Sequence, residues 1–156
     1  MNKIKRIAII AFDNKKTELI EWSYFNRHLL IPHQILAIAY AANVLEGTLN
    51  KKVEVSTAGK LGEYRDLCAL INEEAIDAVI IFSDANEILR NKDLVGVVDA
   101  AIEHNIIVAT NRTTADFVLN SSLINSAYEV HKEEKKIAGS KSSFNVRTSF
   151  PLAKAS

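Results

Sequence analysis

The sequence predicts a single doubly wound α/β domain, in which helices cover both faces of a mainly parallel, five-stranded sheet to give three layers. Short apolar runs rich in Ile, Val and Ala recur along the chain, which is typical of parallel strands buried on both faces. These runs alternate with segments whose apolar residues recur at helical spacing. The chain has 156 residues, enough for one such domain with a substantial core.

The expected elements follow in chain order. We expect strands at residues 6–12, 34–39, 52–56, 78–82 and 106–109. We expect helices at residues 15–28, 41–49, 63–74, 94–104 and 113–119, the fourth ended by the pair His104-Asn105 and the fifth begun by a cap at Thr113. Functional groups of such folds gather at the carboxyl ends of the strands. The loops concerned begin at Asp13, Tyr40, Thr57, Ser83 and Thr110.

A change in composition near residue 130 divides the chain. Residues 1–130 form the expected domain, and residues 131–156 form a polar C-terminal arm or tail. The charge run at residues 132–136 precedes a polar stretch of small residues with one proline. Such compositions bury too little apolar surface to offset the entropy of ordering. We therefore favour a solvated arm over a binding element.

Composition excludes several classes of function. The chain has 19 Lys and Arg and 19 Asp and Glu, so its formal net charge is zero and we expect no binding to nucleic acid. Because a neutral chain is not repelled by a second copy of itself, we also expect a homo-oligomer. Cys68 is the only cysteine and the four histidines lie far apart, which predicts neither a metal site nor a cofactor. With no run of about 20 apolar residues and no signal-like start, we expect no membrane partner and a cytoplasmic protein.

Three stretches carry a resemblance to a known family. They read I-A-I-I-A-F-D-N-K-K at residues 7–16, A-L-I-N-E-E-A-I-D-A-V-I-I-F at 69–82 and I-I-V-A-T-N-R-T-T-A-D-F at 106–117. In this order and spacing they resemble the methylglyoxal synthase-like family, whose fold is also that of the allosteric domain of carbamoyl phosphate synthetase. The resemblance covers about residues 5 to 128. It implies the doubly wound fold, a tendency to form hexamers, and a lyase reaction that turns dihydroxyacetone phosphate into methylglyoxal and phosphate.

Several polar positions of that family are replaced in this chain. The resemblance puts the phosphate cradle at residues 38–42, where Tyr40 is the only polar side chain. It puts the catalytic base at Tyr64, with Glu63 immediately before it. A tyrosine with a pKa near 10 is a poor base at neutral pH. The two histidine positions of the family fall on Phe12 and near Arg90.

Other positions of the family are retained. The resemblance makes ligand-binding candidates of Asp13, Lys16, Gly59 and Asp84, together with Tyr40, Tyr64 and Arg90, and catalytic candidates of Asp93 and Glu63. Each has an ordinary structural alternative. Asp13 and Asp93 can cap helices, Glu63 suits a first helical turn, and Lys16 and Arg90 suit an exposed surface.

Three functions remain open at this point. The first is a module that has lost the family's activity and binds a small anionic or phosphorylated metabolite in the crevice at the strand ends. The second is a divergent, active synthase in which Glu63 or Asp93 serves as base and Lys16 with Arg90 holds the phosphate. The third is an assembly protein with a vestigial pocket. The loss of cradle, base and histidines together favours the first.

Overall fold

A computed structural model describes residues 3–56 and 62–132. Its strands are β1 (Arg6–Ala11), β2 (Gln34–Ala37), β3 (Glu54–Val55), β4 (Ala78–Phe82) and β5 (Ile107–Ala109). They form one sheet in the order β3-β2-β1-β4-β5, and every pair is parallel. The predicted doubly wound sheet is confirmed. Strand order reverses between β1 and β4, which makes the carboxyl ends of these two strands the topological switch point.

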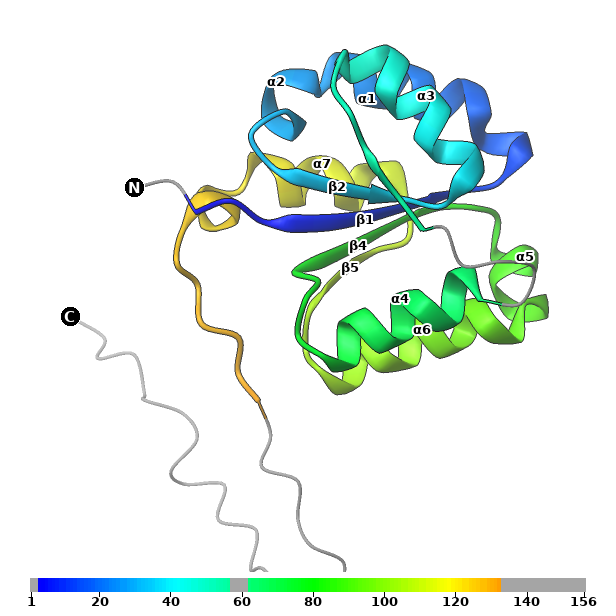
Figure 1. Ribbon diagram of the computed structural model, residues 1–156, viewed down its shortest axis with the longest axis vertical. Coiled ribbons are helices and arrows are strands. Elements are labelled where there is room, and N and C mark those ends of the chain that lie inside the picture. The colour runs from blue at the N-terminus through cyan, green and yellow to red at the C-terminus, as the bar shows by residue number, and fades with distance from the viewer. Residues whose placement is uncertain (1–2, 57–61, 133–156) are drawn as a thin grey trace, which may run out of the picture.

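Helices cover both faces of the sheet (Figure 1). They are η1 (Asp13–Lys15), α1 (Lys16–Phe25), α2 (Arg27–Leu30), α3 (Ala39–Leu49), α4 (Glu63–Asn72), α5 (Ala85–Arg90), α6 (Lys92–Glu103), α7 (Arg112–Asn120) and η2 (Ser122–Asn125). Helices α1, α2, α3 and α7 pack on one face, and α4 and α6 on the other. The three-layer architecture is thereby confirmed.

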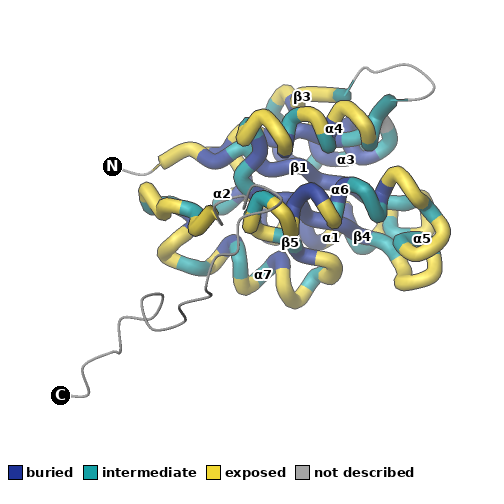
Figure 2. Tube along the Cα trace, turned by 90° about the horizontal axis from the view of Figure 1, so that it is seen from below, coloured by how far each residue is buried: buried dark blue, intermediate teal, exposed yellow. Residues whose placement is uncertain are grey.

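Alternating side chains of the central strands supply both layers of the core. In β1, Ile7 and Ile9 face α1 and α3, whereas Ala8 and Ile10 face α4 and α6. All five residues of β4 are buried. Figure 2 shows these strands buried inside a shell of partly exposed helices. This two-sided burial is why the strands read as continuous apolar runs.

Some expected boundaries were wrong. The expected helix at residues 15–28 is divided at Asn26, whose Nδ2 donates to the Trp22 carbonyl at 3.0 Å. Helix α7 is capped not by Thr113 but by Asn111, whose Oδ1 accepts from the Thr114 N–H at 2.8 Å. Helix α5 was not expected. The predicted end at His104-Asn105 is confirmed, since α6 ends at Glu103 and Asn105 has a left-handed φ of 52°.

The chain from the end of η2 to the first two residues of the expected arm, His131 and Lys132, follows the amino-terminal edge of the sheet. Lys5 Nζ donates to the Ser126 carbonyl at 2.9 Å, and Asn105 Nδ2 donates to the His131 carbonyl at 2.9 Å. Lys132 forms an ion pair with Glu74. Residues 133–156 of the arm lie outside the described residues. No helix in the described ranges is both long and apolar enough to cross a membrane.

Candidate functional site

The switch point between β1 and β4 carries a surface depression of about 530 Å³. The Phe12 N–H donates to the Phe82 carbonyl at 3.1 Å, which holds the ends of the two strands together. Beyond this bond the chain leaves β1 toward α1 on one face and leaves β4 toward α5 and α6. The depression is lined by Phe12, Glu87, Arg90, Asn91, Lys92 and Asp93. Ligands of doubly wound folds bind at this place.

Two helix caps fix the segment that forms most of the lining. Asp84 Oδ1 accepts from the Glu87 N–H at 3.0 Å and caps α5, while Asp84 Oδ2 accepts from Asn14 Nδ2 at 3.3 Å. Asn91 Oδ1 accepts from the Leu94 N–H at 3.1 Å and caps α6. The suggestion that Asp93 caps this helix was wrong. Asp84 already has two partners, which leaves it less available to a ligand.

The charges around the depression differ in whether they are paired. Asp93 lies 3.8 Å from Arg65 Nε, and both side chains are largely exposed. Arg90 and Lys92 form no ion pair with any carboxylate in the described part of the chain. Basic side chains of this kind are suited to binding an anion.

The inner side of this region is aromatic and apolar. Four partly buried side chains near this edge each pack against the core layer of α4 and α6: Phe12, Ile38, Tyr64 and Ile88. Burial raises the pKa of the Tyr64 phenol, and the charges of Glu63 and Glu87 raise it further. The Tyr64 hydroxyl is therefore protonated at neutral pH and can donate a hydrogen bond.

A second group of predicted residues lies at the same sheet edge, on the side of α1 and α3. Asp13 and Lys16 are exposed in η1 and at the start of α1, and Tyr40 is half-buried in the first turn of α3. Asp13 does not cap a helix with its side chain. Burial and the nearby Asp13 carboxylate raise the pKa of Tyr40. None of the three lines the depression.

The structure therefore places the predicted residues in two groups. Arg90 and Asp93 share the depression, while Glu63 and Tyr64 begin α4 close to Glu87. The predicted Gly59 lies outside the described residues. Among described residues, no three His, Cys, Asp or Glu side chains are arranged to hold a metal ion. The ligand-binding and catalytic roles of all nine candidates stay predictions.

Three lining residues were missed from the sequence: Glu87, Asn91 and Lys92. All lie in or beside α5, which was not expected. A cap residue followed three positions later by Glu is a signal for a helix start. Asp84 and Glu87 have this spacing, so the signal was present.

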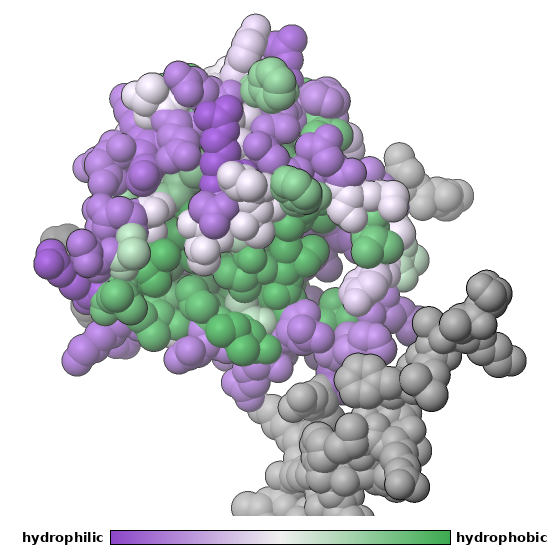
Figure 3. All heavy atoms as spheres, turned by 180° about the vertical axis from the view of Figure 1, so that it is seen from behind, coloured by the Kyte–Doolittle hydropathy of each residue, from purple (hydrophilic) through white to green (hydrophobic). Residues whose placement is uncertain are grey.

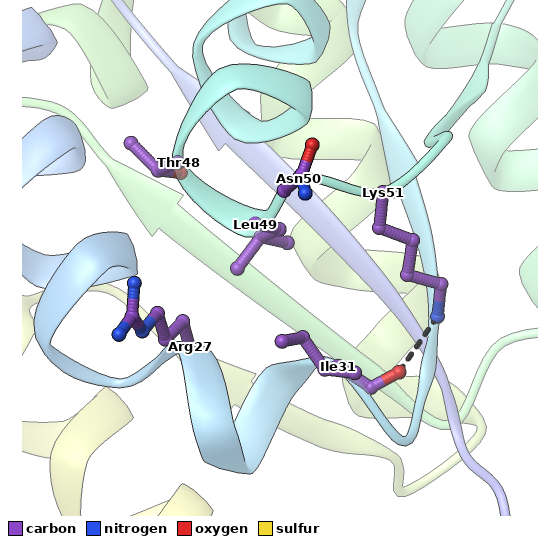
Figure 4. Close-up of a pocket in the computed structure, with 6 residues that line it drawn as sticks. All are labelled: Arg27, Ile31, Thr48, Leu49, Asn50 and Lys51. Atoms are coloured by element: carbon purple, nitrogen blue, oxygen red, sulfur yellow. Dashed lines mark hydrogen bonds between the residues drawn. The ribbon is translucent and has the colours of Figure 1, made fainter.

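Another depression, of about 460 Å³, lies at the opposite edge of the sheet, where α3 ends (Figure 4). Lys51 Nζ donates to the carbonyls of Ile31 at 2.8 Å and His33 at 2.5 Å, so its charge holds the backbone before β2. Arg27 stacks on the Tyr24 ring at 4.8 Å. The basic side chains there already have partners. Doubly wound folds bind their ligands at the carboxyl ends of the strands, and this depression lies at the other edge of the sheet.

Comparison with known proteins identifies the family. No family model matches the chain. It is 36% identical over 120 residues to methylglyoxal synthase of Yersinia enterocolitica, covering 76% of this chain and 79% of that protein. It is 35% identical over 123 residues to methylglyoxal synthase of Yersinia pestis, covering 78% and 80%.

A solved structure agrees with these relatives. The crystal structure of methylglyoxal synthase from Elizabethkingia anophelis superposes with a TM-score of 0.74 at 27% identity, covering 86% of this chain and 89% of that one. Identity above 30% over more than two thirds of the length, together with the shared fold, leads to one conclusion. The chain belongs to the methylglyoxal synthase family.

Proposed function

We propose that this chain binds a small anionic metabolite in the depression at the switch point and does not catalyse the family's reaction. The observation that carries the proposal is the pair Arg90 and Lys92, which line the depression without a carboxylate partner among the described residues. A phosphate or carboxylate group of a ligand would supply that partner. The aromatic neighbours Phe12 and Tyr64 suit a compact organic molecule.

The proposed lack of catalysis rests on the missing catalytic base. Proton removal beside a ketone needs a positioned group whose pKa lies near the working pH. Tyr64, at the position of the family's base, has a raised pKa and holds its proton. Asp93 is exposed and lies beside Arg65. Phe12, at one histidine position of the family, has no group that could donate to an enediolate oxygen.

One observation favours the alternative, a divergent synthase. Asp93 and Arg90 line the same depression, so a carboxylate and a phosphate-binding cation are close enough to act on one substrate. In that reading Asp93 or Glu63 removes the proton, and Arg90 with Lys16 holds the phosphate. Lys16 does not line the depression, which argues against a role for Lys16 in binding the phosphate there.

A turnover assay separates the two readings. With dihydroxyacetone phosphate as substrate, we expect no methylglyoxal and no inorganic phosphate above the background without protein. Glu63→Gln and Asp93→Asn serve as controls, because a true activity should fall by about 10²–10⁴-fold when its base is removed. Turnover that either substitution abolishes would overturn the proposal and establish the synthase.

Binding is tested independently of turnover. A thermal-shift titration with inorganic phosphate and phosphorylated metabolites should reveal stabilisation, which reaches about 2.7 kcal/mol at 100 times the Kd. The double variant Arg90→Ala with Lys92→Ala should weaken the binding at least about tenfold, since each hydrogen bond to a charged group contributes about 1.5–3 kcal/mol. A matched control at the opposite edge, Arg27→Ala with Lys52→Ala, should leave the affinity unchanged. Equal loss in both variants would contradict the proposed site.

The homo-oligomer expected from the sequence, a hexamer by the resemblance, stays a prediction. Figure 3 shows apolar residues gathered on the rear of the molecule, where β5 and α7 lie. Exposed hydrophobic side chains of this region include Ile102 on α6, Ile107 on β5 and Phe117 on α7. An apolar area of this kind supports contact with another chain.

A further inference from the structure

Two buried side-chain oxygen atoms close to the end of β4, Ser83 Oγ and Glu87 Oε2, have no hydrogen-bond partner among the described residues. Glu87 lines the depression itself. Ser83 directly follows β4, and the alternation of that strand puts it on the same face as Ile81, the face where Phe12 and Tyr64 pack. Glu87 therefore belongs to the candidate site, and Ser83 follows the strand that ends there.

An unpaired buried oxygen needs an explanation. Leaving such a group without a partner costs about 1–3 kcal/mol, and more when the group is charged. The ordinary explanation for Glu87 is a capping box, in which the third residue of a helix accepts from the N–H of its cap residue. Half of that box exists, because the Glu87 N–H donates to Asp84 Oδ1. The other half does not account for Glu87 Oε2, which accepts no hydrogen bond.

The depression is also bipolar. Arg90 and Lys92 supply positive charge from the end of α5 and the start of α6. Glu87 supplies negative charge on the aromatic side, and Glu63 lies close enough that both carboxylates act on the Tyr64 phenol. No described cation lies within ion-pair distance of Glu87. The arrangement is complementary to a molecule with a positive and a negative end.

We propose that the ligand is a small zwitterion, whose ammonium group binds Glu87 and whose oxyanion binds Arg90 and Lys92. The inference rests on the proposed function, because it assumes anion binding at this depression. An ammonium group fits Glu87 better than a hydroxyl does, because it carries a positive charge that attracts the carboxylate in addition to donating a hydrogen bond.

The test uses two probes that differ in the ammonium group alone, O-phosphoethanolamine and ethyl phosphate. Calorimetric or NMR titration of the wild-type protein at pH 7 should show an affinity for O-phosphoethanolamine at least about tenfold higher than for ethyl phosphate. Tenfold in affinity corresponds to about 1.4 kcal/mol of binding free energy. Glu87→Gln keeps the shape of the side chain and removes its charge. In that variant the preference should disappear, with the affinity for ethyl phosphate unchanged within about twofold. Glu73→Gln, an exposed change after α4, should retain the preference.

Each other outcome has a definite meaning. Equal affinity of the wild-type protein for both probes would overturn the inference and leave the proposed anion site intact. Failure of both probes to bind would overturn the proposed function together with the inference. If Glu87→Gln lowers the melting temperature but keeps the preference, Glu87 is a helix-capping residue and the inference is wrong. A merely structural role does not discriminate between the two probes.

Discussion

Replacing Trp22 by alanine is expected to lower the free energy of unfolding by about 3–5 kcal/mol. The side chain is fully buried between α1 and the sheet, and its ring centroid lies 4.9 Å from that of Phe82. Its Nε1 donates to Asp116 Oδ1 at 2.9 Å, which ties α1 to α7. The substitution removes both contacts and leaves a cavity. Since domains are stable by only about 5–15 kcal/mol, urea unfolding should show a large shift.

Trp22→Phe separates packing from the hydrogen bond. Phenylalanine keeps most of the aromatic contact with Phe82 and loses the donor to Asp116, which still accepts from Asn26 Nδ2 at 3.2 Å. We expect a smaller loss, about 1–3 kcal/mol. Circular dichroism is the suitable probe, because Trp22 is the only tryptophan. A phenylalanine variant as unstable as the alanine variant would mean that the hydrogen bond, and not burial, fixes α1.

The sheet could be predicted because its central strands are buried on both faces. The run at β4, Ala78–Phe82, was predicted with its observed bounds, and all five of its residues are buried. The edge strand β3 was expected at residues 52–56 but comprises only Glu54–Val55, both exposed. Apolar character marks where a strand is buried. It does not mark where backbone pairing stops.

Helix boundaries depended on contacts that are distant in sequence. Asn26 divides the expected helix at residues 15–28, and its side chain is held by the Trp22 carbonyl and by Asp116, which is 90 positions away. Helix α5 has six residues and none is buried. A helix of that kind has no clear apolar periodicity, so only the spacing of Asp84 and Glu87 could have revealed it.

The candidate site was predicted as a place but not as a set of neighbours. The strand-end rule selected the correct edge, and Arg90 and Asp93 do share a depression there. The same rule could not divide the candidates into two groups on opposite sides of the switch point. Nor could it show that Glu87 is partly buried and acts on Tyr64. These facts depend on how α4 and α5 pack, which is a property of the tertiary structure.

Acidification below about pH 6.5 is expected to lower the free energy of unfolding through His33. This side chain is buried, and its Nδ1 accepts from the Lys5 N–H at 3.0 Å, which requires that nitrogen to be unprotonated. Burial lowers the pKa of His33, the charges of Lys5 and Lys51 lower it further, and Asp77 opposes them. The unfolded chain then binds a proton that the folded chain does not, so stability present above the ordinary pKa of 6.5 is lost as the pH falls. The loss approaches about 1.4 kcal/mol per pH unit until the folded pKa is reached.

His33→Asn is the matched variant for this effect. An asparagine Oδ1 can accept from the Lys5 N–H in place of Nδ1, and the side chain does not titrate. Urea unfolding at several pH values from 7.5 to 5.5 should therefore show a steeper loss of stability in the wild-type protein than in the variant. Identical slopes would mean that His33 takes up a proton as readily in the folded protein as in the unfolded chain, and that another group dominates the acid response. Since His33 lies just before β2, at the edge opposite the depression, the substitution should leave binding of the phosphate probes unchanged.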